Sequence, residues 1–349
     1  MMEMRKRGSV RLISRHLVAL CCLYVGAWVF PSTCSADGLF VGNFSGSGEI
    51  LEYNATTGAF IGMFGPLVSF PLGGAFGPDG NFYATNSDTD TVLQLNGSTG
   101  AVINSTFASS VDNAAGLVFG PTKNLFVVSS SSPGHLNVLN GTTGAVITTV
   151  DAGGILMDPE GITRGPDGNI YVAGGDGASV LKFNGTTGAF LGTFVSTGSG
   201  GLKSARGVAF GPNGDLYVTS FGTNQVLRYN GTTGAFIGVF AAATPGACSG
   251  LSLPRDLVFG PNGNLFVGSF GSGDIFEYNG TSGACVADFV PAGTGGLAGP
   301  TFLLFGEGGF TSIPEPSSLA LLAFAVVGLA MLKRRNIRGG THASGIIAT

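Results

Sequence analysis

A phrase of twelve residues recurs six times along this 349-residue chain, and its period restricts the fold more than any other feature. The clearest copy, YNGTTGAFIGVF, begins at Tyr229, and close copies begin at Tyr53, Leu95, Leu139, Phe183 and Tyr278. Its asparagine recurs at intervals of 42, 44, 44, 46 and 49 residues. A period near 45 residues with strand-like content indicates a propeller or an array rather than a row of independent domains.

A second landmark alternates with the first. It is Phe-Gly-Pro in four units, Arg164-Gly-Pro in one and Phe305-Gly-Glu in the last. Between the landmarks of one unit, the sequence predicts strands at residues 207–210, 216–220, 225–229 and 235–240, separated by turn residues. We expect Asn230 and Gly234 to bracket the last hairpin, since Asn tolerates a left-handed backbone and Gly has no Cβ to obstruct one.

The two ends of the repeat region complement each other. The first unit, from Gly38, lacks an innermost strand, and residues 301–306 (TFLLFG) supply an innermost strand with no unit after it. Joined, they complete a sixth blade and remove two open edges. The sequence therefore predicts an all-β fold over residues 37–310: a six-bladed β-propeller of four-stranded antiparallel blades, closed by pairing N-terminal strands with a C-terminal innermost strand.

The unit GVAFGPNGDLYVTSFGTNQVLRYN, from Gly207, resembles the NHL-type and SMP-30/streptogramin-lyase-like six-bladed propellers. The resemblance spans residues 38–306 and is specific for the fold. It implies no single activity, because that superfamily includes lactonases, lyases, scaffolds and binding proteins.

Residues 1–36 have the three parts of a secretory signal peptide. Five basic residues precede a 14-residue apolar run that ends at Pro31, and small residues lead to Ala36, where we expect cleavage. An uncleaved anchor is the alternative, although the run is short for a membrane span. Lipidation of Cys34 is a further alternative, but the residues before it lack the usual aliphatic side chain.

Residues 311–349 resemble a PEP-CTERM sorting signal. Pro314, Glu315 and Pro316 precede an apolar run at 319–332, and Lys333, Arg334 and Arg335 close it. The run spans a membrane only marginally, and the basic cluster holds its end on the cytoplasmic side. The resemblance implies processing by an exosortase after transient insertion in the inner membrane, and export to the cell surface or beyond in a setting of exopolysaccharide. An ordinary C-terminal anchor is the alternative.

Charge restricts the partners. Residues 37–313 hold seven Lys and Arg against 18 Asp and Glu, a net charge of −11, whereas both ends of the chain are basic. An acidic body disfavours nucleic acid and anionic lipid as partners.

Propeller sites usually lie at the mouth of the central channel. Four positions before the second landmark, the six units carry Leu72, Ala115, Glu160, Arg206, Arg255 and Thr301. Three consecutive units thus offer charged residues, with Asp256 beside Arg255 and Arg164 further along the Glu160 strand. Two guanidinium groups near a carboxylate could hold an acidic or polyhydroxy ligand such as a sugar acid. A set of ion pairs that stiffens the channel wall is the competing interpretation.

Catalytic and metal-binding patterns are weak. The only histidine between the two end segments, His135, lies in a hairpin, so a streptogramin-type lyase would lack its base at the channel. A lactonase of the SMP-30 type would need a channel cation, and Arg206 and Arg255 would repel it. Asp88 and Asp90 are turn residues without the flanking pattern of a calcium loop. We expect no metal, no cofactor and no enzyme activity.

Two cysteines fall in the predicted propeller. Cys248 lies in the longest loop between units, and Cys285 replaces a phenylalanine of the repeated phrase. An oxidising compartment favours a disulfide between them. The alternative is two thiols at opposite ends of one blade.

Together these features predict an exported surface or matrix protein that binds polysaccharide or an envelope protein. A hydrolase or lyase with an altered channel site is the alternative, and a structural spacer of the extracellular matrix is a third possibility.

Overall fold

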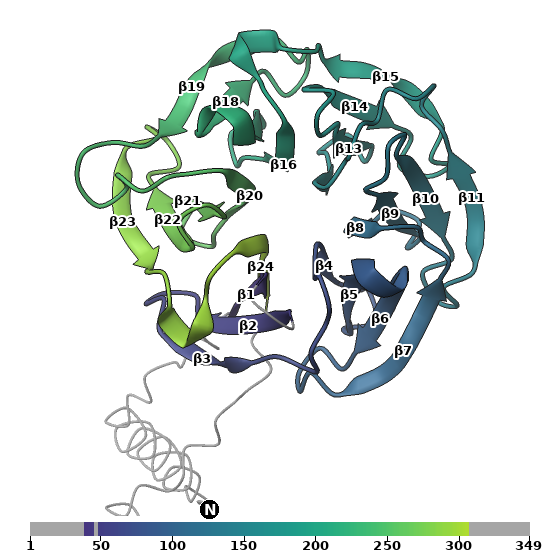
Figure 1. Cartoon of the computed structure of the whole chain (residues 1–349). Helices are drawn as coiled ribbons and strands as arrows, with labels where there is room; N and C mark the ends of the chain where they lie inside the picture. The colour runs from purple at the N-terminus through teal and green to yellow at the C-terminus, as the bar shows by residue number, and fades with distance from the viewer. Residues whose placement is uncertain (1–37, 45–47, 307–349) are drawn as a thin grey trace, which may run out of the picture. The chain divides into compact units, whose positions relative to one another are not determined.

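The structure, a computed structural model, describes residues 38–44 and 48–306. Six four-stranded antiparallel sheets stand around a central axis as the blades of a propeller (Figure 1). The only helical elements among these residues are four three-residue 3-10 turns. The predicted fold class is confirmed.

The strand order places one strand of each blade at the axis and one at the rim. The innermost strands are β24 (Pro300–Gly306), β4 (Gly74–Phe76), β8 (Ala114–Phe119), β12 (Ile162–Arg164), β16 (Ala205–Phe210) and β20 (Pro254–Phe259). The second strands are β1 (Gly38–Asn43), β5 (Phe82–Asn86), β9 (Leu125–Ser129), β13 (Ile170–Ala173), β17 (Leu216–Ser220) and β21 (Leu265–Ser269). The third strands are β2 (Glu49–Asn54), β6 (Thr91–Leu95), β10 (His135–Leu139), β14 (Val180–Phe183), β18 (Gln225–Tyr229) and β22 (Asp274–Tyr278). The outermost strands are β3 (Phe60–Met63), β7 (Val102–Ser109), β11 (Val146–Val150), β15 (Phe190–Val195), β19 (Phe236–Ala242) and β23 (Cys285–Val290).

The repeated phrase forms the turn between the third and outermost strands. Gly234 adopts a left-handed backbone with φ of 72°, as predicted. Asn230 does not: its side-chain Oδ1 instead accepts hydrogen bonds from the backbone N–H groups of Thr232 (3.0 Å) and Thr233 (2.9 Å). Asn230 and Gly234 do bracket the hairpin, since the N–H of Gly234 donates to the carbonyl oxygen of Asn230 at 2.8 Å. The asparagine closes the turn with its side chain and not with a left-handed backbone.

Ring closure joins the two ends of the described chain. Strand β24 pairs antiparallel with β1, with Leu39 opposite Phe305 and Val41 opposite Leu303. The blade β24-β1-β2-β3 is thus built from both ends, as predicted, and no sheet in the described part of the chain is left incomplete. Among the described residues, all six sheets are complete and six core clusters pack them, all within residues 38–306.

Aromatic side chains pack the blades against one another. The ring of Tyr217 contacts Phe240 of its own blade (centroids 4.7 Å apart) and Phe259 of the next blade (4.9 Å). Tyr83, Tyr171 and Phe266 make the same two contacts at three other blades. The phenylalanine of the Phe-Gly-Pro landmark is therefore a packing residue that reaches across from the neighbouring blade.

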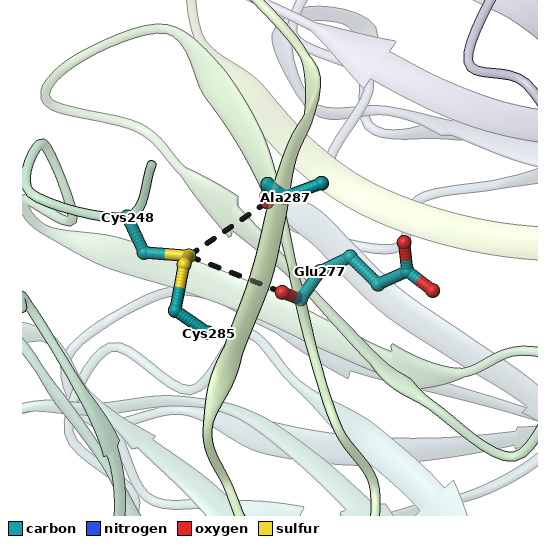
Figure 2. Close-up of a disulfide and its surroundings, with 4 residues drawn as sticks. All are labelled: Cys248, Glu277, Cys285 and Ala287. Carbon is teal, nitrogen blue, oxygen red and sulfur yellow. Dashed lines mark hydrogen bonds between the residues drawn. A yellow bond between two sulfur atoms is a disulfide. The ribbon is translucent and has the colours of Figure 1, made fainter. Parts of the chain in front are cut away.

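A disulfide joins Cys248 to Cys285 (Figure 2). It fixes the loop between β19 and β20 to the rim strand β23. The Cys248 sulfur also lies 3.9 Å from the carbonyl oxygen of Glu277 and 3.7 Å from that of Ala287. A disulfide sulfur has no proton to donate, so we treat both as packing contacts.

The predicted signal peptide (1–36) and sorting segment (311–349) lie outside the described residues. Within residues 38–44 and 48–306, no helix has the length and apolar character needed to cross a membrane.

Candidate functional site

The innermost strands enclose a channel cavity of about 210 Å³, lined by residues of all six blades. Its wall is mostly glycine and aliphatic residues such as Gly116, Leu117, Ile162 and Val208. Charged side chains reach it from only three neighbouring blades, those of β12, β16 and β20. The channel is therefore chemically one-sided, although its backbone is close to sixfold symmetric.

Close contact between innermost strands makes the channel narrow. The N–H of Gly116 donates to the carbonyl oxygen of Glu160 in the next blade at 2.9 Å. A Cβ at Gly161 would collide with the carbonyl oxygen of Arg206. For this reason glycine follows the residue four positions before the second landmark in four of the six units. Large polar side chains are confined to the mouth of the channel.

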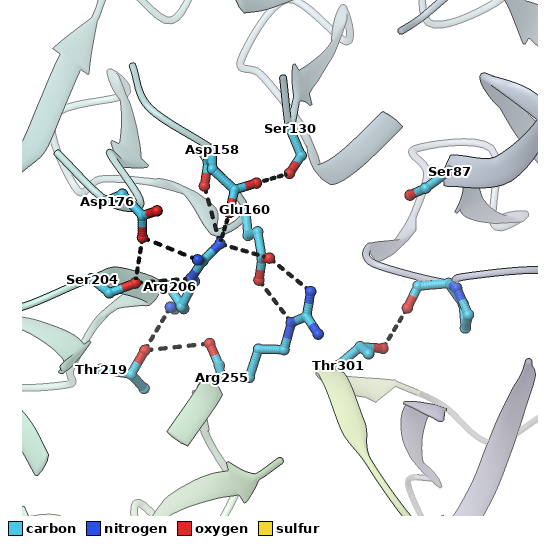
Figure 3. Close-up of polar contacts among 12 residues, drawn as sticks. Ser87, Ser130, Asp158, Glu160, Asp176, Ser204, Arg206, Thr219, Arg255 and Thr301 are labelled. Atoms are coloured by element: carbon cyan, nitrogen blue, oxygen red, sulfur yellow. Dashed lines mark hydrogen bonds and ion pairs between the residues drawn. The ribbon is translucent and has the colours of Figure 1, made fainter. Parts of the chain in front are cut away.

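At the mouth, one carboxylate holds two guanidinium groups (Figure 3). Arg255 donates from Nε to Glu160 Oε2 at 2.7 Å and from Nη2 to Oε1 at 2.7 Å, a bidentate pair. Arg206 donates from Nη1 to the same Oε1 at 2.8 Å. The three side chains are only 11–13% exposed. The structure thus brings together Glu160, Arg206 and Arg255, which the sequence placed on consecutive units.

Arg206 has further acidic partners. Nη1 also lies 2.6 Å from Asp158 Oδ2, and Nη2 lies 3.2 Å from Asp176 Oδ1. Burial alone would raise the pKa of Asp158, but hydrogen bonds from Ser130 and Arg206 outweigh it and hold that pKa below its usual value. Burial lowers the pKa of Arg206, and the charges of Glu160 and Asp158 overcome this and raise it.

Three carboxylates therefore surround two guanidinium groups, so the formal charge of the cluster is −1. Every nitrogen of Arg206 has a protein partner. Among the described residues, Arg255 Nη1 has no hydrogen-bond partner, so it is the guanidinium nitrogen left to meet a ligand. This arrangement repels an anion and leaves one strong donor for a neutral oxygen.

Asp256 does not join the cluster. It occupies a position where four other units have glycine, so its side chain lies between innermost strands and its Oδ2 accepts the N–H of Leu303 at 2.8 Å. Burial raises its pKa to about 6, although the backbone hydrogen bonds lower it. The channel still reaches part of the residue. Asp256 therefore ties β20 to the closing strand β24.

Arg164 is also separate. It ends β12 and is exposed, and the structure does not bring it to Glu160 at the opposite end of that segment.

An arc of phenylalanine side chains borders the cluster on the same face. Phe270 lies under the Arg255 guanidinium (4.9 Å from ring centroid to Cζ), and Phe221 lies under that of Arg206 (5.5 Å). Phe44 stacks toward Phe270 (centroids 6.0 Å apart) and contacts Phe70 (4.2 Å). Phe44 and Phe70 are 38% and 37% exposed. We call these four residues the aromatic arc.

The sequence analysis missed the aromatic arc, although the sequence carries a signal for it. Phe44, Phe221 and Phe270 each follow the last residue of a second strand, in NFS, SFG and SFG, whereas the equivalent positions of the other three units are not aromatic. Asp158 and Asp176 were also missed. Both lie in loops outside the repeat landmarks, so alignment of the units does not reveal them.

Catalytic groups are sparse at the mouth. His135 begins β10, a third strand, and is not among the residues that line the channel. Within the described ranges, no group of three or more His, Cys, Asp or Glu side chains is placed to hold a metal ion.

Comparison with known proteins identifies the C-terminal signal and the fold class. Residues 312–335 match the PEP-CTERM protein-sorting motif. A search of curated proteins gives no match. The chain is therefore a six-bladed β-propeller protein with a PEP-CTERM motif at its C-terminus. This motif implies processing by an exosortase and export, with transient anchoring of the C-terminal end in the membrane.

Solved structures resemble the propeller at low sequence identity. A chain of a Nidogen/Laminin complex has a TM-score of 0.61 at 16% identity, over 77% of this chain and 98% of that one. Virginiamycin B lyase from Staphylococcus aureus has 0.53 at 18%, over 68% and 77%. A gluconolactonase from Xanthomonas campestris has 0.54 at 14%, over 77% and 92%. The propeller thus has structural neighbours of the streptogramin-lyase and gluconolactonase type, and at these identities the likeness shows the fold alone.

Proposed function

We propose that this exported propeller is a binding protein whose channel mouth holds a neutral polysaccharide at the cell surface or in the extracellular matrix. The observation that carries the proposal is the aromatic arc beside the single unpartnered nitrogen of Arg255. The C–H faces of a sugar ring pack on aromatic faces, and a few fixed polar groups orient its hydroxyls. Arg255 Nη1 would supply one such group.

Charge supports a neutral ligand over a sugar acid. The mouth cluster is already net negative, and the predicted propeller segment carries −11. A polyuronate would be repelled by both, and neither guanidinium of the mouth cluster, Arg206 or Arg255, has two unpartnered nitrogens with which to hold its carboxylates. An uncharged polysaccharide is not repelled by these negative charges.

We propose that the protein is not a hydrolase or lyase. The described residues that line the channel include no histidine, and its two arginines would repel a catalytic cation. Divalent-metal-dependent hydrolysis of a lactone by the purified protein would contradict this part of the proposal.

Affinity electrophoresis through gels that contain a neutral or an acidic polysaccharide tests the binding role. We expect retardation by the neutral polymer alone, and Phe44→Ala should weaken it about tenfold, since stacking of an aromatic ring is worth about 1 kcal/mol or more. Phe190→Ala is a matched control, because Phe190 is 37% exposed but lies on the rim strand β15. Equal retardation of both variants would contradict the proposed site, and no retardation by any polysaccharide would favour a structural spacer.

A further inference from the structure

The rim of the propeller repeats one irregularity in all six blades. In each blade the pairing between the third and outermost strands shifts by one residue at the same place, as between Arg228↔Gly238 and Tyr229↔Phe236. The extra residue of this β-bulge is always aliphatic. The six bulged residues, which we call the rim belt, are Ile61, Ile103, Ile147, Leu191, Ile237 and Val286.

Rim-belt side chains are aliphatic, yet they are largely exposed to solvent. Their exposed fractions run from 44% at Ile61 to 54% at Ile147. None of the six belongs to a core cluster, so burial within one propeller does not explain the choice of residue. Apolar side chains that recur at one exposed place indicate contact with another surface.

The rim also lacks the usual protection of a sheet edge. Proteins often place lysine or proline on edge strands to prevent association. The six outermost strands contain neither, and their one charged residue is Asp288. The bulges do interrupt the free backbone edge, which disfavours the addition of a further strand. The rim is therefore suited to contacts through side chains.

We propose that the rim belt is the surface through which copies of this protein pack edge to edge into a lateral assembly. The rim strands face outward all around the ring (Figure 1), so a flat membrane could touch only one or two blades at once, whereas neighbouring copies can surround the ring. Each copy offers the same apolar element on every blade. The acidic body makes copies repel one another, and the nearly uncharged rim is where two of them approach at least electrostatic cost.

The strength of one contact is limited by its size. The outermost strand of one blade exposes only one to three large apolar side chains, which cannot bury the roughly 1,200 Å² of a stable interface. A single contact is therefore weak, and several contacts per copy at high local concentration, as on a crowded cell surface, are needed for assembly. This proposal does not depend on the ligand at the channel mouth.

Sedimentation velocity of residues 37–310 from micromolar to near-millimolar concentration tests the assembly. We expect a sedimentation coefficient that rises with concentration. The triple variant Ile103→Thr, Ile147→Thr, Ile237→Thr keeps β-branched residues on the strands but should weaken association at least tenfold. Unchanged thermal melting of the variant would show that it still folds.

A control triple variant removes similar exposed apolar groups away from the rim: Leu67→Thr, Ile155→Thr and Met157→Thr, whose side chains are 55%, 42% and 39% exposed. It should associate like the wild type. Wild-type protein that stays monomeric throughout, or equal association of both triple variants, would overturn the proposal. So would rim-dependent binding of the monomer to vesicles of neutral lipid. Normal assembly of Phe44→Ala would separate this surface from the channel mouth.

Discussion

Glu160 and Arg255 meet in a bidentate ion pair across the channel mouth although 95 residues separate them in the chain. Their blades are not neighbours, because the β16 blade stands between them, and its Arg206 binds the same carboxylate. One side chain therefore connects three consecutive blades. The pair stabilises the ring, and it also orients the Arg255 guanidinium so that Nη1 is available to a ligand.

Glu160→Gln should destabilise the protein by about 3 kcal/mol, because it leaves two largely buried guanidinium groups without their shared charge. Urea unfolding of the two proteins measures this. Lys182→Met provides the comparison, since the Lys182–Asp167 pair is 27% and 40% exposed and should contribute about 0.5 kcal/mol or less. Equal effects of the two substitutions would contradict the fastening role.

Asp256 should make the protein more stable at mildly acidic pH. Its pKa rises from 3.8 to about 6 on folding, so the folded state binds the proton more tightly than the unfolded state. The contribution of this group to stability is then greatest below about pH 4, falls by about 2–3 kcal/mol as the pH rises through 6, and levels off about one pH unit higher. Asp256→Asn, which keeps an acceptor for Leu303, should remove this slope from unfolding measured across pH 4–7. If the unfolding free energy of the variant depends on pH as strongly as that of the wild type, another group is responsible for the dependence.

Much of the fold could be predicted because the sequence repeats. The repeats show the length of one unit, the number of strands in it, and the two partial units at the ends that together complete the sixth blade. Strands β17 and β18 begin and end where the sequence predicts, whereas β16 begins at Ala205, two residues early. The difference arises because pairing with β17 extends past a β-bulge that sequence alone does not mark.

The site was less predictable. Alignment of the units found Glu160, Arg206 and Arg255, because a propeller places equivalent residues in one ring. It found Glu160 as a partner of Arg206 but not Asp158 or Asp176, since these two come from loops whose paths depend on tertiary packing. It also suggested a sugar acid, and only the added carboxylates show that the mouth is net negative.

Ring closure should be sensitive to a single methyl group. A Cβ at Gly42 would collide with the Phe302 ring and the Thr301 hydroxyl of the closing strand β24. Gly42→Ala should therefore cost about 2 kcal/mol in free energy of unfolding. Gly62→Ala is the control, because nothing lies within 4 Å of its added Cβ. We expect that variant to match the wild type or exceed it slightly. If Gly42→Ala leaves the free energy of unfolding unchanged, Gly42 is not tightly packed against the closing strand β24.

Reduction of Cys248–Cys285 should lower stability by about 4 kcal/mol, the loop-closure estimate for a sequence separation of 37 residues. Guanidinium unfolding with and without reductant measures the effect. A Cys248→Ser, Cys285→Ser variant should be as unstable as the reduced protein and insensitive to reductant. If reductant leaves the wild-type midpoint unchanged, the disulfide does not fasten this loop.

A fluorescent reporter at the channel mouth tests the central claim most directly. The only tryptophan, Trp28, lies in the predicted signal peptide, so Phe270→Trp in residues 37–310 places one tryptophan in the aromatic arc. Titration with a neutral polysaccharide should shift its emission in a saturable way, and Phe190→Trp on the rim should not respond. A response of the rim reporter alone, or binding that leaves the emission of the Phe270→Trp variant unchanged, would contradict ligand recognition at the channel mouth.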